Sequence, residues 1–186
     1  MVHAVYTSAM NHATVIATYS RRMRVALDDG REVFARIKGK RLKPVCGDQV
    51  EVEPIDQEDD WLITDIGPRR NELTRPNMRG QVEILAANLD YLVVVAAAEP
   101  RPDWFIVDRY LCAAELMGID ACVVFNKSDI GIADARYELD TYFDIGYDVV
   151  ACSALTGDGM DNVRNLLATH RAIIVGQSGV GKSSII

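Results

Sequence analysis

The chain has 186 residues, of which 49% are hydrophobic and 25% charged, a composition that excludes a largely disordered protein. It contains no run of about 18 apolar residues and no N-terminal secretory pattern, so we expect no membrane partner, and its four widely spread cysteines favour a reducing cytoplasm. The net charge of −7 is uneven, because residues 1–80 carry 13 Lys and Arg against 12 Asp and Glu, whereas residues 81–186 carry 7 against 15. This asymmetry indicates two domains with different partners.

The first part of the chain has the pattern of short strands separated by turns. Apolar and β-branched residues alternate with polar ones, and the Asp29-Gly30 step is a strong hairpin signal. The expected strands are Ala13–Tyr19, Met23–Leu27, Glu32–Ile37, Gln49–Glu53 and Trp61–Ile66. Five short strands without a helical period favour a closed all-β barrel of the oligonucleotide-binding (OB) fold, which we place in residues 1–70. Residues 71–83 are interpreted as a linker.

From residue 84 to residue 186 the pattern changes to alternating strands and helices. The expected strands are Tyr91–Ala97, Ala121–Phe125, Asp148–Cys152 and Arg171–Val175, and the expected helices are Trp104–Met117, Asp134–Phe143 and Met160–Thr169. The strands are continuous apolar runs, as expected where a parallel sheet is buried on both faces. This second domain is therefore predicted to be α/β.

A phosphate-binding motif follows the last of these strands. The sequence from Gly176 to Ser183 satisfies G-x-x-x-x-G-K-[ST] between a strand and the start of a helix. Glycines let backbone N–H groups turn toward phosphate oxygens, Lys182 would reach the β and γ phosphates, and the Ser183 hydroxyl would bind Mg²⁺. The residues expected to bind nucleotide here are Gly176, Gln177, Ser178, Gly179, Val180, Gly181, Lys182, Ser183 and Ser184.

Two further loops follow predicted parallel strands, where α/β sheets bind ligands. The first contains Asn126, Lys127, Ser128 and Asp129. Its aspartate can accept two hydrogen bonds from guanine that adenine cannot donate, its asparagine would hold another edge of the base, and its lysine stem would lie along the ring. The second contains Ser153 and Ala154, whose backbone N–H could meet the guanine carbonyl oxygen. Together the three motifs favour guanine nucleotide binding, although the phosphate loop alone leaves an adenine-nucleotide enzyme open.

The order of these motifs is unusual, because the guanine loops precede the phosphate loop. A circularly permuted GTPase domain behind an OB barrel closely resembles the ribosome small subunit-dependent GTPase A family. The supporting segments are 87–90, 108–111, 126–129, 146–147 and 176–184. The resemblance implies GTP or GDP with Mg²⁺ as cofactors, GTP hydrolysis stimulated by the small ribosomal subunit, a role in its late maturation, and contact with ribosomal RNA. We expect the protein to be a monomer.

Basic residues cluster in the predicted barrel, where a solvated surface is the simpler interpretation of composition alone. The resemblance favours RNA contact, which would be salt-sensitive and read little sequence. The candidate RNA-binding residues are Arg21, Arg22, Arg24, Arg36, Lys38, Lys40, Arg41 and Lys43.

The end of the sequence departs from the family pattern. Family members continue past the phosphate loop with switch regions, including Asp-x-x-Gly, and with a C-terminal zinc-binding region. No Asp in this chain has Gly three residues later, and no Cys-x-x-Cys pair is present. We therefore expect an incomplete GTPase domain with no zinc, an unassigned catalytic residue and weak hydrolysis. An RNA-binding module that uses nucleotide only as a structural or regulatory ligand is the alternative.

Overall fold

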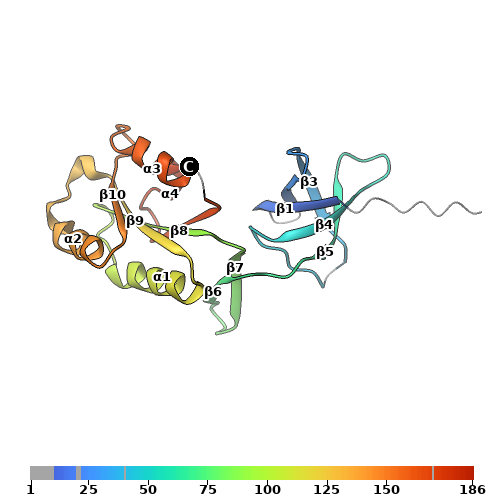
Figure 1. The fold of residues 1–186 in the computed structure, drawn as a ribbon, viewed down its shortest axis with the longest axis horizontal. Coiled ribbons are helices and arrows are strands. Elements are labelled where there is room, and N and C mark those ends of the chain that lie inside the picture. Colours follow the sequence, from blue (N-terminus) through green and yellow to red (C-terminus); the bar gives the residue numbers. More distant parts are fainter. Residues whose placement is uncertain (1–10, 20–21, 40, 169) are drawn as a thin grey trace, which may run out of the picture. The chain divides into compact units, whose positions relative to one another are not determined.

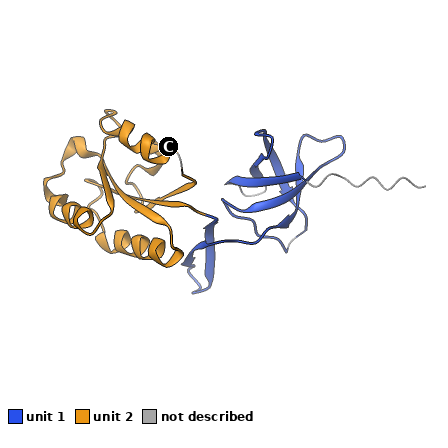
Figure 2. Cartoon of the chain, in the orientation of Figure 1, with its two compact units in different colours: residues 1–88 blue, residues 89–186 orange. Residues whose placement is uncertain are grey.

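Two compact units make up the chain, residues 1–88 and residues 89–186 (Figure 2). The computed structural model describes residues 11–19, 22–39, 41–168 and 170–186. Across these described segments, no helix is long and apolar enough to cross a membrane.

The first unit contains a closed barrel (Figure 1). Its strands are β1 (Asn11–Thr18), β2 (Met23–Leu27), β3 (Glu32–Ile37), β4 (Gln49–Pro54) and β5 (Trp61–Ile66), in the spatial order β1-β2-β3-β5-β4. The β3–β5 pair is parallel and the other pairs are antiparallel. Alternate residues, among them Val15, Val25 and Ile63, fill the interior at 1% exposure or less. The predicted OB-type barrel is confirmed, with strand ends shifted by at most two residues.

A β-hairpin stands where the sequence suggests a linker. It pairs β6 (Glu72–Pro76) with β7 (Val82–Ala87) in antiparallel register. The turn is held by Asn77, whose Oδ1 accepts hydrogen bonds from the backbone N–H groups of Arg79 and Gln81 at 2.9 and 3.0 Å. In β6 only Leu73 is buried. The strand therefore shows almost no apolar alternation, and its one proline, Pro76, is typical of a linker, so its pairing with β7 is not visible in the sequence.

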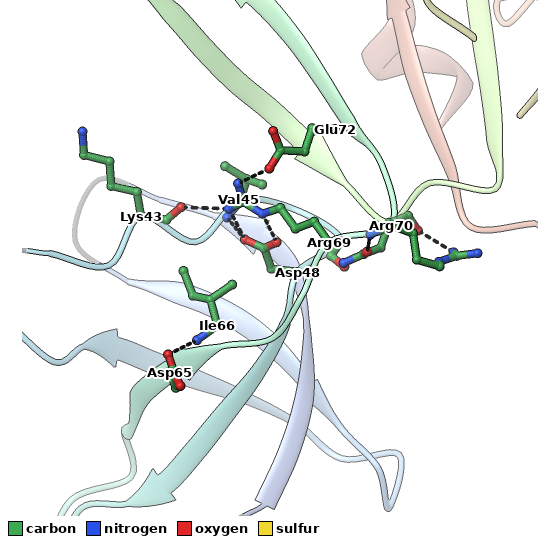
Figure 3. Close-up of polar contacts among 10 residues, drawn as sticks. Lys43, Val45, Asp48, Asp65, Ile66, Arg69, Arg70 and Glu72 are labelled. Carbon is green, nitrogen blue, oxygen red and sulfur yellow. Dashed lines mark hydrogen bonds and ion pairs between the residues drawn. The ribbon is translucent and has the colours of Figure 1, made fainter. Parts of the chain in front are cut away.

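The hairpin is attached to the barrel by polar contacts and a close backbone approach within the first unit (Figure 3). The Arg69 guanidinium donates to both carboxylate oxygens of Asp48, at 2.7 and 2.8 Å, and to Glu72 of β6 at 2.9 Å. Asp48 is fully buried. At Gly47 (φ +90°) a Cβ atom would lie 1.8 Å from the carbonyl oxygen of Ala87, so only glycine fits there.

The second unit is built on a four-stranded parallel sheet. Its strands are β8 (Tyr91–Ala97), β9 (Asp120–Asn126), β10 (Asp148–Ala151) and β11 (Ala172–Gly176), in the spatial order β10-β9-β8-β11. Every residue of β8 is buried. The predicted α/β sheet is confirmed, and β11, the last strand in the chain, pairs with β8, the first.

Helices cover both faces of this sheet (Figure 1). They are α1 (Trp104–Met117), α2 (Arg136–Asp144), α3 (Met160–Leu167) and α4 (Lys182–Ile185), with 3-10 turns η1 (Ser128–Ile130) and η2 (Ala133–Ala135). Met160 and Val163 of α3 and Ile185 of α4 pack with Val93 and Val95 of β8 on one face. Figure 1 shows α1 on the other side of the sheet. Because the four strands are parallel, the carboxyl ends of β8, β9, β10 and β11 all lie at one edge of the sheet.

Candidate nucleotide-binding site

The three motifs predicted from the sequence lie at the carboxyl edge of the parallel sheet. Residues 126–129 follow β9, residues 152–154 follow β10, and the phosphate loop follows β11. Strand β8 is the neighbour of both β9 and β11, so the loop after β8 lies at the same edge of the sheet as the three motifs. Ligands bind at this edge of α/β sheets, so the permuted chain order is compatible with a single site.

Two glycines of the phosphate loop are required by close backbone approaches. A Cβ atom on Gly176 (φ +143°) would lie 2.2 Å from the carbonyl oxygen of Val95 in β8. A Cβ atom on Gly181 (φ +90°) would lie 2.3 Å from the Nδ2 atom of Asn126. The loop is therefore packed tightly on β8 and on the asparagine, and it leaves the backbone without side chains where phosphate oxygens would approach.

Lys182 is already oriented by the loop that precedes it. Its Nζ atom donates to the carbonyl oxygens of Gly176 at 3.0 Å and Gln177 at 2.7 Å. An ammonium group has three N–H donors, so one remains for an anion. The half-buried Lys182 and the glycine cradle fit a phosphate group. Ser183 is exposed in the first turn of α4, next to this position.

Asn126 connects all three motifs through its side-chain amide. The Nδ2 atom donates to the carbonyl oxygen of Val180 at 2.9 Å, and the Oδ1 atom accepts from the Ala154 N–H at 3.0 Å. The residue is 2% exposed. The Asn126 side chain and the Ala154 N–H, which we expected to face the base, are therefore hydrogen-bonded to each other in the structure. Their contacts with a base remain predictions. The amide instead fixes the phosphate loop against the loop after β10.

Lys127 makes a second connection between the loop after β9 (residues 126–129) and the phosphate loop. Its backbone has φ +59°, and its Nζ atom donates to the carbonyl oxygens of Glu99 at 2.6 Å and Gly179 at 2.8 Å. Glu99 is not among the site residues predicted from the sequence, although the carboxyl ends of parallel strands are where ligands gather and Glu99 lies in the loop after β8. These bonds hold the lysine stem in one position.

Asp129 lies in the 3-10 turn η1 and is exposed. Among the described residues no side chain pairs with its carboxylate. The turn is held by the Ser128 N–H, which donates to the carbonyl oxygen of Cys152 at 3.1 Å. Asp129 is therefore presented by a positioned turn with its acceptor oxygens accessible.

The loop after β10 is shaped by the buried Ser153. Its Oγ atom accepts from the Thr156 N–H at 3.1 Å, and its own N–H donates to the Asp158 carbonyl oxygen at 2.8 Å. The preceding Cys152 is fully buried, and burial raises the pKa of its thiol, so it stays uncharged beside Asn126. Ser153 is thus a structural residue of the site.

The comparison with known proteins agrees with this arrangement. The family model described as RsgA GTPase matches residues 66–186. The chain belongs to the RsgA GTPase family.

Relatives of known name or structure in the RsgA GTPase family extend the match to the barrel. A Pseudomonas aeruginosa protein named small ribosomal subunit biogenesis GTPase RsgA is 37% identical over 177 residues, covering 92% of this chain and 52% of the relative. The crystal structure of YjeQ from Thermotoga maritima superimposes with a TM-score of 0.71 at 28% identity, covering 95% of this chain and 63% of that one. The structure of YloQ, described as a circularly permuted GTPase, has a TM-score of 0.65 at 23% identity, covering 98% and 65%. The predicted permuted fold is confirmed, and the chain spans about half the length of the curated relatives it matches.

The basic residues of the barrel of this RsgA GTPase family member divide into paired and unpaired groups. Arg21 and Lys40 lie outside the described residues. Among the described residues, four of the predicted RNA-binding side chains form ion pairs, namely Arg22–Asp60 (3.1 Å), Arg24–Glu32, Arg36–Glu58 and Lys38–Glu53 (3.5 Å). Arg36 also lies 3.3 Å from Asp60. Arg41 and Lys43 are exposed, and no carboxylate within the described part of the chain pairs with them.

Proposed function

We propose that this chain binds GTP or GDP with Mg²⁺ at the carboxyl edge of its parallel sheet. The observation that carries this proposal is the buried Asn126 amide, which joins the loops of the three guanine-nucleotide motifs. A site assembled before ligand arrives loses less conformational freedom on binding. At Gly176 and Gly181 of the phosphate loop a Cβ atom would meet Val95 and Asn126, so the glycines let this loop pack directly against the sheet and the asparagine.

Each residue of the site then has a distinct role. Lys182 holds the β and γ phosphates with its remaining N–H, and Asp129 accepts the two guanine donors. Lys127 keeps its stem along the base while its ammonium stays bonded to Glu99 and Gly179. Ser183 would ligate Mg²⁺ together with phosphate oxygens, and the metal would neutralise phosphate charge.

We also propose that the protein is a GTPase acting in maturation of the small ribosomal subunit. Support comes from the family, whose named relatives are small ribosomal subunit biogenesis GTPases. We expect the small subunit to stimulate hydrolysis, the protein to act as a cytoplasmic monomer, and the barrel to contact ribosomal RNA. Tyr19 and Phe34 support RNA contact, because these exposed rings lie with centroids 6.4 Å apart and can stack on bases.

Hydrolysis by these 186 residues alone is proposed to be slow. GTP hydrolysis needs a γ-phosphate sensor and a positioned water, and the sequence contains no Asp-x-x-Gly to supply the sensor. The same observation favours a second candidate function, an RNA-binding module with nucleotide as a structural or regulatory ligand. With nucleotide as a structural ligand only, that candidate predicts equal RNA affinity with GTP and with GDP, and a nucleotide-dependent difference would exclude this form of it.

Base recognition is tested by Asp129→Asn. The amide cannot accept both guanine donors, and it can pair with xanthine, so affinity should shift from GTP toward xanthosine triphosphate by at least about tenfold. Equilibrium titration of both nucleotides into both proteins measures the shift. Because Asp129 is exposed, the melting temperature should not change. An unchanged preference would show that Asp129 does not read the base.

Stimulation by the small subunit is tested by adding purified small subunits to the protein and following phosphate release. A full-length relative that matches this chain serves as the positive control, and Lys182→Ala as the inactive one. No stimulation in a system where the full-length relative responds would reject the enzymatic role for this chain and leave the binding-module candidate.

A further inference from the structure

The strand face that OB folds commonly use to bind their ligands carries basic side chains whose charge is already compensated by carboxylates. Arg24 in β2 pairs with Glu32, and Arg36 in β3 lies against both Glu58 and Asp60. A cation paired with a carboxylate must give up that partner before it binds a phosphate, so its gain from RNA is small. These residues therefore contribute little to attraction of a polyanion, although sequence position suggests them.

Arg41 and Lys43, in the segment between β3 and β4, are different. Both are exposed, and neither is paired with a carboxylate anywhere in the described ranges. The undescribed residues 1–10, 20–21, 40 and 169 include no Asp or Glu. Both cations therefore retain their full charge toward solvent.

The segment that carries them is held in place (Figure 3). Leu42 packs against the barrel core, and the Lys43 carbonyl oxygen accepts a hydrogen bond from Arg69 at 3.3 Å. The next residues are fixed as well, because the Val45 N–H donates to the Asp48 carboxylate at 2.8 Å. Leu42 thus anchors the segment to the barrel, whereas Arg41 and Lys43 on either side of it are exposed.

A groove of about 510 Å³ adjoins this segment within the first unit. Its lining includes Arg41, Leu42, Lys43, Ile66, Arg69 and Glu72. Arg69 is held by Asp48 and Glu72, and these hydrogen bonds raise the pKa of its guanidinium, so it stays charged. The groove thus combines two free cations with apolar walls, whereas the charge of Arg69 is already compensated by Asp48 and Glu72.

We propose that this groove binds the sugar–phosphate backbone of RNA, with Arg41 and Lys43 contacting its phosphates. The inference rests on the proposed RNA contact of the barrel. It locates that contact away from the basic side chains of β2 and β3, which are paired with carboxylates. Because the contacts are to phosphates, binding is insensitive to base sequence and weakens steeply with salt.

The test compares two double variants with the same change of net charge. Arg41→Gln/Lys43→Gln removes the free cations, and Arg24→Gln/Lys38→Gln removes two paired ones. Each protein is titrated with protein-free small-subunit ribosomal RNA and with intact small subunits, from about 0.05 to 0.3 M salt. Removing two phosphate contacts should weaken binding about 10- to 30-fold at about 0.15 M salt and reduce the slope of log affinity against log salt by about 1.4–1.8. The matched control should change affinity less than about threefold.

Each outcome separates the groove from the wider proposal. If both double variants lose affinity equally, or only the control does, the groove is wrong while RNA binding stands. A loss of Arg41→Gln/Lys43→Gln binding with intact subunits but not with protein-free RNA would mean an acidic protein surface instead and would overturn the inference. If the unaltered chain binds neither probe, the proposed RNA contact itself fails. Unchanged melting temperatures confirm that both variants are folded, as expected for exposed side chains.

Discussion

Gly181 and Asn126 depend on each other at the level of single atoms. The asparagine amide occupies the space where a side chain at position 181 would begin. A Cβ atom at this position would lie 2.3 Å from the Asn126 Nδ2 atom. The same amide bonds Val180 and Ala154. A change at the glycine therefore disturbs the phosphate loop and both guanine loops together.

Gly181→Ala should destabilise the protein by more than backbone strain alone. A left-handed conformation costs an alanine about 1–2 kcal/mol, and here Asn126 must also move and leave buried backbone groups unpaired, at about 1–3 kcal/mol. Urea unfolding measures the loss, and nucleotide titration should show weaker binding. The matched control is Gly30→Ala, with φ +84° and nothing within 4 Å of the new Cβ atom. Equal losses in the two variants would show that the contact with Asn126 is unimportant.

At the scale of elements, the attachment of the β6–β7 hairpin to the barrel depends on one buried ion pair. Asp48 is fully buried and accepts three hydrogen bonds, two from Arg69 and one from the Val45 N–H. The Arg69 side chain is 15% exposed. A carboxylate in this environment needs its cation, because desolvation of an unpaired charge is expensive.

Arg69→Gln should reduce the free energy of unfolding of the first unit by about 3–5 kcal/mol, since it leaves the Asp48 carboxylate buried without its cation. The matched control is Arg75→Gln, which breaks the exposed 3.0 Å pair with Glu83 in the same hairpin and should cost less than about 1 kcal/mol. Denaturant unfolding followed by hydrogen exchange at residues 72–87 measures both effects. Similar small losses would contradict a structural role for the Asp48–Arg69 pair.

At the scale of the whole molecule, groups buried in the neutral state make stability depend on alkaline pH. Burial raises the pKa of the Cys122 thiol from 9.0 to about 12, and burial with the Glu115 hydrogen bond raises that of the Tyr147 hydroxyl from 10.0 to about 12. The unfolded chain releases these protons more readily, so it gains stability relative to the folded state above pH 9. The contribution of both groups is full below about pH 9 and is lost as the pH rises toward about 12.

The free energy of unfolding should therefore fall between about pH 9 and pH 11, and Cys122→Ala should reduce that fall by roughly 2 kcal/mol. Urea titrations of both proteins at three pH values measure the difference. The comparison at constant pH removes the contribution of the other titrating groups. An identical pH dependence in the two proteins would contradict a buried neutral thiol.

Much of the architecture could be predicted because its signals are local. The apolar run of β8 and the helical spacing of α1 identify both elements with correct ends, since burial on two faces or on one stripe sets the pattern directly. The hairpin could not be predicted, because β6 contains one buried residue and depends on its partner strand. Similarly, Arg24 and Arg41 are equivalent basic residues in the sequence, and only the folded barrel shows that Arg24 is paired with Glu32.

The sequence by itself determined the two-part organisation, the permuted order of the motifs and the types of residue in the candidate site, because these follow from periodicity and from short motifs within the chain. Only the tertiary structure decided how those residues are used. Asn126 bonds Val180, 54 positions away, and Asp48 bonds Arg69, 21 positions away. Such partners are chosen by packing and by the need to satisfy buried polar groups, which act between segments that are distant in the chain.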